Sequence, residues 1–267
     1  MSASSQPPGF QSGRRGPGLR PAEGSAEATY SAGTASLAFL EAGDKNSGVT
    51  AAGLQRRLTA QLVATGVTAP DDVVAACVEY LVLLGRWNRR INLTAFDLES
   101  PSEAALNRLI LEPLAAARFV LRDDLTAVDI GSGSGSPALP LALMTRALSW
   151  TLFEAREKKS AFLREAARVL GLRNVTVETA RVGDDVIPEP LRGAVTLVTV
   201  RAVRLDGAVW RGIEAIARPD CRLLVFGNSV IQQNTHLAGG WVPSAEVLWQ
   251  EGPRLSFLQK TGDRNQP

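Results

Sequence analysis

The chain has 267 residues with 29 basic and 27 acidic side chains, a formal net charge of +2, so its overall charge does not indicate a nucleic-acid binder. The length and a hydrophobic content of 45% allow one sizeable core with a smaller appended domain. A single histidine, His236, and two cysteines, Cys77 and Cys221, exclude a spaced zinc cluster and argue against a nucleophilic triad. With no apolar run near the roughly 18 residues of a membrane span and no signal-peptide pattern at the start, we expect a cytoplasmic protein without a metal.

The first part of the chain, residues 1–48, is rich in Ser, Gly, Pro and Ala and has little apolar content. Such a segment buries too little apolar surface to offset the entropy that it loses on ordering. We therefore expect residues 1–48 to be a disordered extension.

Residues 49–120 show the apolar periodicity of helices. A first apolar stripe ends near Gly66, and a second begins after a proline, with Asp71 or Asp72 as the expected cap. A third helix is expected after Ser100, because residues 100–103 have the shape of a capping box, with Pro101 at the first helical position and Glu103 placed to bond back to the cap. The pattern predicts a small helical subdomain over 49–120.

From residue 121 to residue 267, short apolar strands alternate with helical segments, which is typical of a parallel sheet covered on both faces. The sequence predicts strands at 126–130, 150–154, 175–179, 195–200 and 222–226, with helices at 138–148, 158–170 and 208–217. We therefore expect an α/β domain of the Rossmann-like kind, with a doubly wound sheet of five strands.

Residues 128–136 run from the first predicted strand into a turn of glycines and serines that opens a helix. Gly131, Gly133 and Gly135 allow positive φ and a close approach of the backbone to a ligand. The pattern indicates a nucleotide-type ligand, with an ordinary Gly/Ser turn as the alternative.

Details around this turn distinguish two classes of cofactor. A dinucleotide loop normally has a further glycine where this chain has Ser136 and Pro137, and the carboxylate of Asp129 would repel a pyrophosphate. A methionine ammonium is attracted by that carboxylate, which favours S-adenosylmethionine. Glu154 ends the next predicted strand, where either cofactor class uses a carboxylate to accept hydrogen bonds from ribose hydroxyls.

Three later residues complete the predicted cofactor cleft. Val182 and Gly183 follow the third predicted strand, where a loop flanks an adenine ring or merely connects two elements. Arg201 follows the fourth, at the carboxyl edge of the sheet where α/β proteins bind ligands. We expect Arg201 to be catalytic and to bind the cofactor, with a surface role as the alternative.

Basic side chains that could contact RNA are scattered over the predicted helices. Guanidinium and ammonium groups pair with phosphates, and guanidiniums also stack on bases, although a solvated helix face explains each of them equally well. Trp87 is expected to anchor the second helix on the core. The candidate RNA-binding residues are Arg86, Arg89, Arg90, Arg108, Lys158 and Lys159.

Two motifs resemble those of a known family. Residues 86–94, RWNRRINLT, resemble the signature Lys-Trp-Asn-x-x-x-Asn-Leu-Thr of the bacterial small-subunit ribosomal RNA guanine-N7 methyltransferases, the glucose-inhibited division protein B family. Residues 131–141 resemble its Gly-x-Gly-x-Gly-x-Pro-Gly-x-Pro-Leu pattern, and Arg201-Ala202 matches its Arg-Ala after the fourth strand. The similarity runs from about residue 54 to residue 260.

The resemblance implies methylation of N7 of guanine 527 in 16S ribosomal RNA, with S-adenosylmethionine as cofactor and the RNA or the small ribosomal subunit as partner of a monomer. By position, Gly131, Ser136, Val182, Gly183 and Arg201 would line the cofactor or active site. Guanine N7 already presents a lone pair, so attack on the methyl group needs positioning and no general base.

The chain also departs from the family pattern. Where the family shows Arg-His-x-x-Asp-Ser, this chain reads RLILEP at 108–113, and Val200 and Ser136 replace a usual serine and a usual apolar residue. These departures keep open a methyltransferase of the same fold that acts on another substrate. They also keep open a catalytically silent relative that binds RNA or ribosomes.

Overall fold

The structure is a computed structural model that describes residues 50–121, 123–183, 185, 187–227, 240–248 and 254–260. The predicted extension 1–48 lies outside these residues, as does His236.

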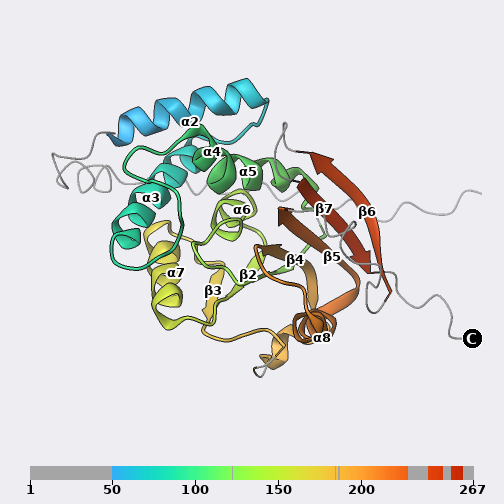
Figure 1. The fold of residues 1–267 in the computed structure, drawn as a ribbon. Coiled ribbons are helices and arrows are strands. Elements are labelled where there is room, and N and C mark those ends of the chain that lie inside the picture. The colour runs from blue at the N-terminus through green and yellow to red at the C-terminus, as the bar shows by residue number, and fades with distance from the viewer. Residues whose placement is uncertain are drawn as a thin grey trace, which may run out of the picture.

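A sheet of seven strands in the order β3-β2-β1-β4-β5-β7-β6 forms the centre of the molecule (Figure 1). The five strands from β3 to β5 are parallel, and β7 lies antiparallel to both β5 and β6. The strands are β1 Thr126–Ile130, β2 Ser149–Phe153, β3 Val175–Glu178, β4 Val195–Arg201, β5 Ala217–Gly227, β6 Trp241–Leu248 and β7 Arg254–Lys260.

The first five strands confirm the predicted α/β fold, and four of them match the expected ranges to within one residue at each end. The prediction of only five strands is wrong, because β6 and β7 add an antiparallel pair at one edge. Pro243 and Ser244 interrupt the apolar pattern of β6, and its register shifts between Pro243 and Ala245. β5 also begins earlier than predicted, at Ala217, directly after a helix.

The N-terminal helical segment is more broken than predicted. α2 ends at Gly66 as expected, with a left-handed φ of 68°, but neither Asp71 nor Asp72 caps α3, which begins after Pro70 without a side-chain cap. The cap of the third helix is Ser102, whose hydroxyl accepts from the Ala105 amide. The elements are α2 Ala51–Thr65, α3 Asp71–Asn88, α4 Glu103–Leu106, a π-helix Asn107–Leu111, α5 Glu112–Ala116 and a 3-10 turn Ala117–Phe119.

Helices cover both faces of the sheet, and α8 lies opposite α2, α4 and α5 in Figure 1. Successive side chains of β1 belong to two separate apolar clusters: Ala127 lies in one and Val128 in the other. The first cluster contains residues of both the helical segment and the sheet, such as Leu84 and Trp150, so the two share one core. The boundary at 120 stays a prediction. The remaining helices are α6 Ala138–Met144, α7 Glu157–Val169, the 3-10 turn Glu189–Leu191 and α8 Gly207–Ile216.

Within the described ranges, the structure has no helix that is both long and apolar enough to span a membrane.

Candidate active site

The glycine loop, residues 131–136, connects β1 to α6 at the carboxyl edge of the sheet. The amides of Gly131 and Ser132 both donate to the carbonyl of Phe153, at 2.9 and 3.0 Å, which fastens the loop to the end of β2. Gly131 has a φ of 71°, and a Cβ there would lie 2.6 Å from Cγ2 of Val203. Close packing and positive φ together require glycine at 131.

Asp129 lies in β1 beneath this loop with a side chain that is 1% exposed. Its Oδ1 accepts a hydrogen bond from the Thr199 hydroxyl of β4 at 2.5 Å, whereas Oδ2 has no partner among the described residues. Burial raises the pKa of Asp129 to about 6, against the opposing effects of the Thr199 and Ser132 hydroxyls and of Arg201. A buried acceptor without a donor is costly, and it fits a cationic ligand group.

Glu154 follows β2 and joins the glycine loop to the start of α7. Its Oε2 accepts from the Gly133 amide at 2.9 Å, and its Oε1 accepts from the Arg156 amide at 2.8 Å. The side chain is buried. Each carboxylate oxygen can accept a second hydrogen bond, so these contacts leave room for the expected ribose hydroxyls.

Arg201 ends β4, and its guanidinium turns inward beneath the loop. Nη1 donates to the Arg108 carbonyl and to the Ser136 hydroxyl, the latter at 2.9 Å, and Nη2 donates to Glu112 Oε2 at 2.8 Å. The guanidinium carbon lies 4.7 Å from the centre of the Phe226 ring. Burial lowers the pKa of Arg201 to about 10, although Glu112 opposes that shift.

These contacts bear on the expected catalytic role of Arg201. Its side chain is 9% exposed, and Nε is buried without a partner among the described residues. Because the guanidinium is held from several sides, the geometry favours a residue that positions the loop and the cofactor over one that reaches an RNA base.

Val182 and Gly183 lie against α8. A Cβ at Gly183 would lie 2.0 Å from the Ala208 carbonyl oxygen, and one at Gly212 would lie 2.4 Å from Cγ1 of Val182. Close packing of the loop on the helix is therefore sufficient to explain glycine at 183 and 212. The contact of this loop with an adenine ring stays a prediction.

Sequence reasoning missed three residues that hold the site. The buried Tyr80 of α3 donates its hydroxyl to the Ser134 carbonyl at 2.8 Å, so the helical segment supports the loop directly. Thr199 donates a hydrogen bond to Asp129, and Glu112 accepts one from Arg201. Only Tyr80 gave a usable signal, because a tyrosine in an apolar stripe needs a partner for its hydroxyl.

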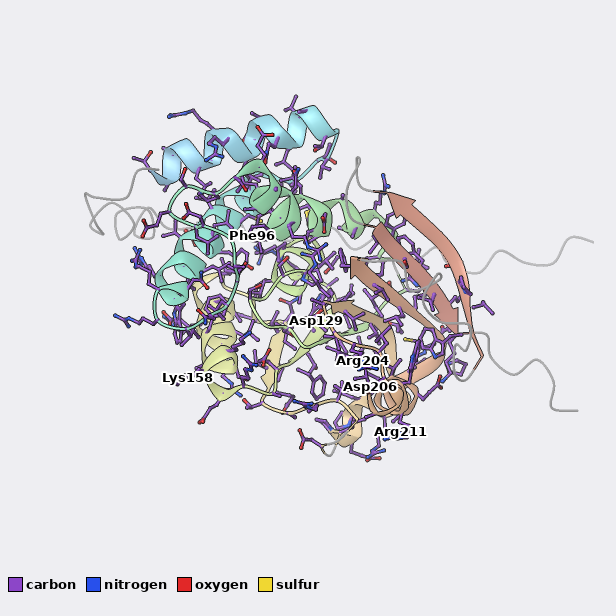
Figure 2. All side chains as sticks on the ribbon, in the orientation of Figure 1. Phe96, Asp129, Lys158, Arg204, Asp206 and Arg211 are labelled. Carbon is purple, nitrogen blue, oxygen red and sulfur yellow. The ribbon has the colours of Figure 1, made fainter. Side chains whose placement is uncertain are left out.

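The candidate RNA-binding residues fall into two groups. Lys158 and Lys159 lie in the first turn of α7, just after Glu154, and Arg108 donates to Glu112 at 3.2 Å within the Arg201 network. Figure 2 shows Lys158 on α7 and Asp129 near the centre of the molecule.

The other group, Arg86, Arg89 and Arg90, lies at the end of α3 beside α7. Trp87 confirms the expected anchoring role, because its indole N–H donates to Glu165 at 3.1 Å and its ring packs edge-on against Phe162. This end of α3 therefore packs against the middle of α7 and not against the glycine loop.

The residues fit S-adenosylmethionine on one specific observation. Asp129 Oδ2 and Arg201 Nε, a buried acceptor and a buried donor on the paired strands β1 and β4, both lack partners among the described residues. An amino acid group carries the complementary pair, an ammonium and a carboxylate. Within the same residues, no group of three or more metal-binding side chains occurs.

Comparison with known proteins gives one consistent result. Residues 74–225 match the family model described as GidB, rRNA small subunit methyltransferase G. Curated proteins called ribosomal RNA small subunit methyltransferase G are similar to this chain. The protein from Xylella fastidiosa strain M23 is 36% identical over 193 residues, 72% of this chain and 84% of that protein.

Two further relatives carry the same name. The Xanthomonas oryzae pv. oryzae protein of strain MAFF 311018 is 35% identical over 205 residues, 76% of this chain and 89% of its own length. The Alkalilimnicola ehrlichii protein is 40% identical over 119 residues, 45% of this chain, and the match spans only 52% of that relative.

Proposed function

This chain belongs to the rRNA small subunit methyltransferase G family, and on that premise we propose that it methylates N7 of a guanine, guanine 527, in 16S ribosomal RNA. The structural observation that supports methyl transfer from S-adenosylmethionine is the pair of unpartnered buried groups, Asp129 Oδ2 and Arg201 Nε, beside the glycine loop. The position in the RNA follows from the resemblance of the sequence motifs to those of the family. The RNA or the small ribosomal subunit is the partner, and the cytoplasm is the expected location.

S-adenosylmethionine is the cofactor, and its positively charged sulfonium supplies an activated methyl group. Asp129 would accept a hydrogen bond from the ammonium, Arg201 Nε would donate to the carboxylate, and Glu154 would accept from the ribose hydroxyls. Val182 and Gly183 would border the adenine.

The reaction proposed for this site does not require a general base. Guanine N7 presents its lone pair at neutral pH, so the protein needs only to hold the base in line with the methyl group. The absence of a histidine between residues 1 and 235 is therefore compatible with the reaction. Thr199 keeps the Asp129 carboxylate in place through its hydroxyl.

Binding of RNA is assigned first to Lys158 and Lys159, since they follow Glu154 directly on α7. Lys158 is exposed and Lys159 half-buried, so both can approach phosphates of an RNA strand that covers the cleft. Nη1 of Arg89 lies 3.8 Å from Oε1 of Glu99. Because Arg89 already has this carboxylate as a partner, it is a weaker candidate for binding RNA.

The proposed position is tested by mapping the methyl group. Small ribosomal subunits from a strain that lacks the modification are incubated with the protein and S-adenosylmethionine, and the RNA is cleaved chemically at 7-methylguanine and read by primer extension. We expect one new stop, next to guanine 527. A single stop elsewhere would overturn the position and keep the activity, and no stop with intact cofactor binding would favour a silent relative.

A further inference from the structure

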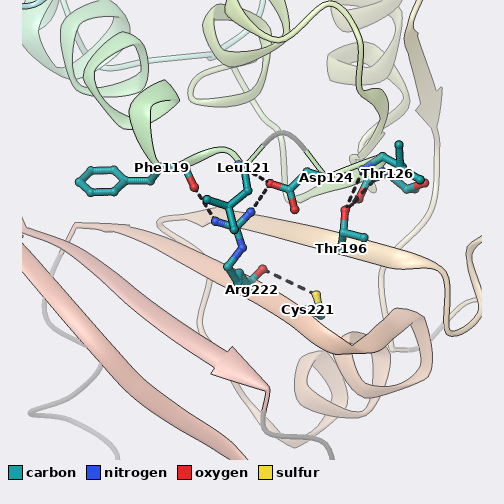
Figure 3. Close-up of polar contacts among 8 residues, drawn as sticks. Phe119, Leu121, Asp124, Thr126, Thr196, Cys221 and Arg222 are labelled. Carbon is teal, nitrogen blue, oxygen red and sulfur yellow. Dashed lines mark hydrogen bonds and ion pairs between the residues drawn. The ribbon is translucent and has the colours of Figure 1, made fainter. Parts of the chain in front are cut away.

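Two ion pairs with buried carboxylates lie at opposite edges of the sheet. At the carboxyl edge, Arg201 at the end of β4 binds Glu112 of α5 at 2.8 Å. At the amino edge, Arg222 of β5 binds Asp124, just before β1, and donates to the Phe119 carbonyl (Figure 3). The two carboxylates are almost equally buried, at 7% and 5% exposure.

The carboxylate of Glu112 is shared between two guanidiniums. Its Oε2 accepts from Arg201 at 2.8 Å and from Arg108 at 3.2 Å. The other contacts of Arg201 with the described residues are neutral, namely the Arg108 carbonyl, the Ser136 hydroxyl and the Phe226 ring. Among the described residues, Glu112 is thus the only carboxylate that forms an ion pair with Arg201.

Loss of this charge would leave Arg201 with another buried anion nearby. Asp129 and Arg201 already act on each other electrostatically, each favouring the charged form of the other. Asp129 Oδ2 and Arg201 Nε are both free of hydrogen bonds in the described structure. A guanidinium released from Glu112 has a strong electrostatic reason to pair with Asp129, and such a pair would occupy the groups assigned to the cofactor.

We propose that Glu112 is a positioning residue for the cofactor, which holds the Arg201 guanidinium against Ser136 and away from Asp129. The groups that bind the ammonium and the carboxylate thereby stay open. This inference rests on the cofactor site of the proposed function.

A purely structural role for Glu112 gives a different expectation, and the chain supplies the matched control. Asp124 is a buried carboxylate that binds one arginine of the same sheet, but at the edge away from the glycine loop. Removal of either charge takes away the carboxylate that pairs with Arg201 or with the half-buried Arg222, and lowers stability. Only removal of the Glu112 charge is expected to change cofactor affinity.

The experiment compares Glu112→Gln, Glu112→Asp and Asp124→Asn with the wild type. Isothermal titration with S-adenosylmethionine is done well below the Tm of each variant. We expect both amide variants to lower Tm, but only Glu112→Gln to raise Kd, by about tenfold or more. The kcat at saturating cofactor should change by less than about threefold, since Lys158 and Lys159, to which RNA binding is assigned first, are untouched.

Glu112→Asp keeps the charge and is expected to restore part of the affinity, which also answers the case in which Glu112→Gln fails to fold. A wild-type Kd in Glu112→Gln, or an equal loss of affinity in Asp124→Asn, would overturn the inference. So would an aspartate variant that folds but binds no better than Glu112→Gln. Wild-type protein that binds the cofactor without methylating RNA would contradict the proposed function alone.

Discussion

The Ser136 hydroxyl donates to the Leu109 carbonyl, to which Pro113 offers no N–H. Pro113 stands four residues after Leu109 in the helical segment and has no N–H to donate to that carbonyl. The Ser136 hydroxyl donates to it instead, at 2.8 Å, and accepts from Arg201 at 2.9 Å. Two positions at which the chain departs from the family pattern thus complement each other.

This relationship predicts a non-additive double-mutant cycle. Ser136→Ala should lower the free energy of unfolding by about 2 kcal/mol, because it leaves buried polar groups without a partner. In a Pro113→Ala background the restored N–H can satisfy Leu109, so the same change should cost about 1 kcal/mol less. Urea unfolding of the four proteins measures the coupling, and strictly additive effects would contradict it.

The contact of Gly131 with Val203 predicts a loss of cofactor binding in Gly131→Ala. The added methyl group would lie 2.6 Å from the Val203 side chain, on a backbone with positive φ, so the loop must shift. We expect Kd for S-adenosylmethionine to rise about tenfold or more. Gly66→Ala is the control, because Gly66 has a similar φ and open space around it; it should cost about 1 kcal/mol of stability and leave Kd unchanged.

Asp129 predicts a specific dependence of stability on pH. Its pKa is about 6 in the folded protein and 3.8 in the ordinary carboxyl, so between these values the folded state holds more protons than the unfolded state. The contribution of Asp129 to stability is therefore greatest at low pH and falls as pH rises through this window.

The corresponding variant is Asp129→Asn, which does not titrate. Relative to the wild type, it should gain about 3 kcal/mol in the free energy of unfolding between pH 3.5 and pH 7.5, while it binds S-adenosylmethionine more weakly. Urea unfolding at several pH values gives the difference. Parallel curves for the two proteins would show that the carboxyl titrates normally.

Asn88 is expected to stabilise the connection between α3 and α4. Its side-chain oxygen accepts from the amides of Leu93 and Thr94, and its amide nitrogen donates to the Thr94 carbonyl. Asn88→Ala should therefore cost about 2 to 3 kcal/mol and expose this connection to proteolysis. The exposed Asn92 lies in the same segment, and Asn92→Ala should change neither property.

The fold was predictable where local pattern decides it. β1 lies between the charged residues 122–124 and the glycine loop and was expected at its observed bounds, whereas Pro243 interrupts the pattern that would have indicated β6. The third helix shows the same limit at smaller scale, since the capping pattern predicts Ser100 as its cap, whereas Ser102 caps it in the structure.

The sequence predicts which residues form the site but not which of them contact one another. Asp129, Glu154 and the glycines follow from strand ends and from positive φ. The inward turn of Arg201 depends on the Arg108 carbonyl of the π-helix and on Glu112 of α5, both far away along the chain. No spacing in the sequence indicates that Arg201 pairs with these residues.

The most direct test of the account is transfer of tritium from labelled S-adenosylmethionine to small ribosomal subunits. Subunits from a strain that lacks the modification are compared with subunits that carry it, using the wild-type protein and Arg201→Ala. We expect label to enter only the unmodified subunits and to be lost with the variant. Unlabelled RNA in unmodified subunits, despite measured binding of the cofactor by the wild type, would contradict the account.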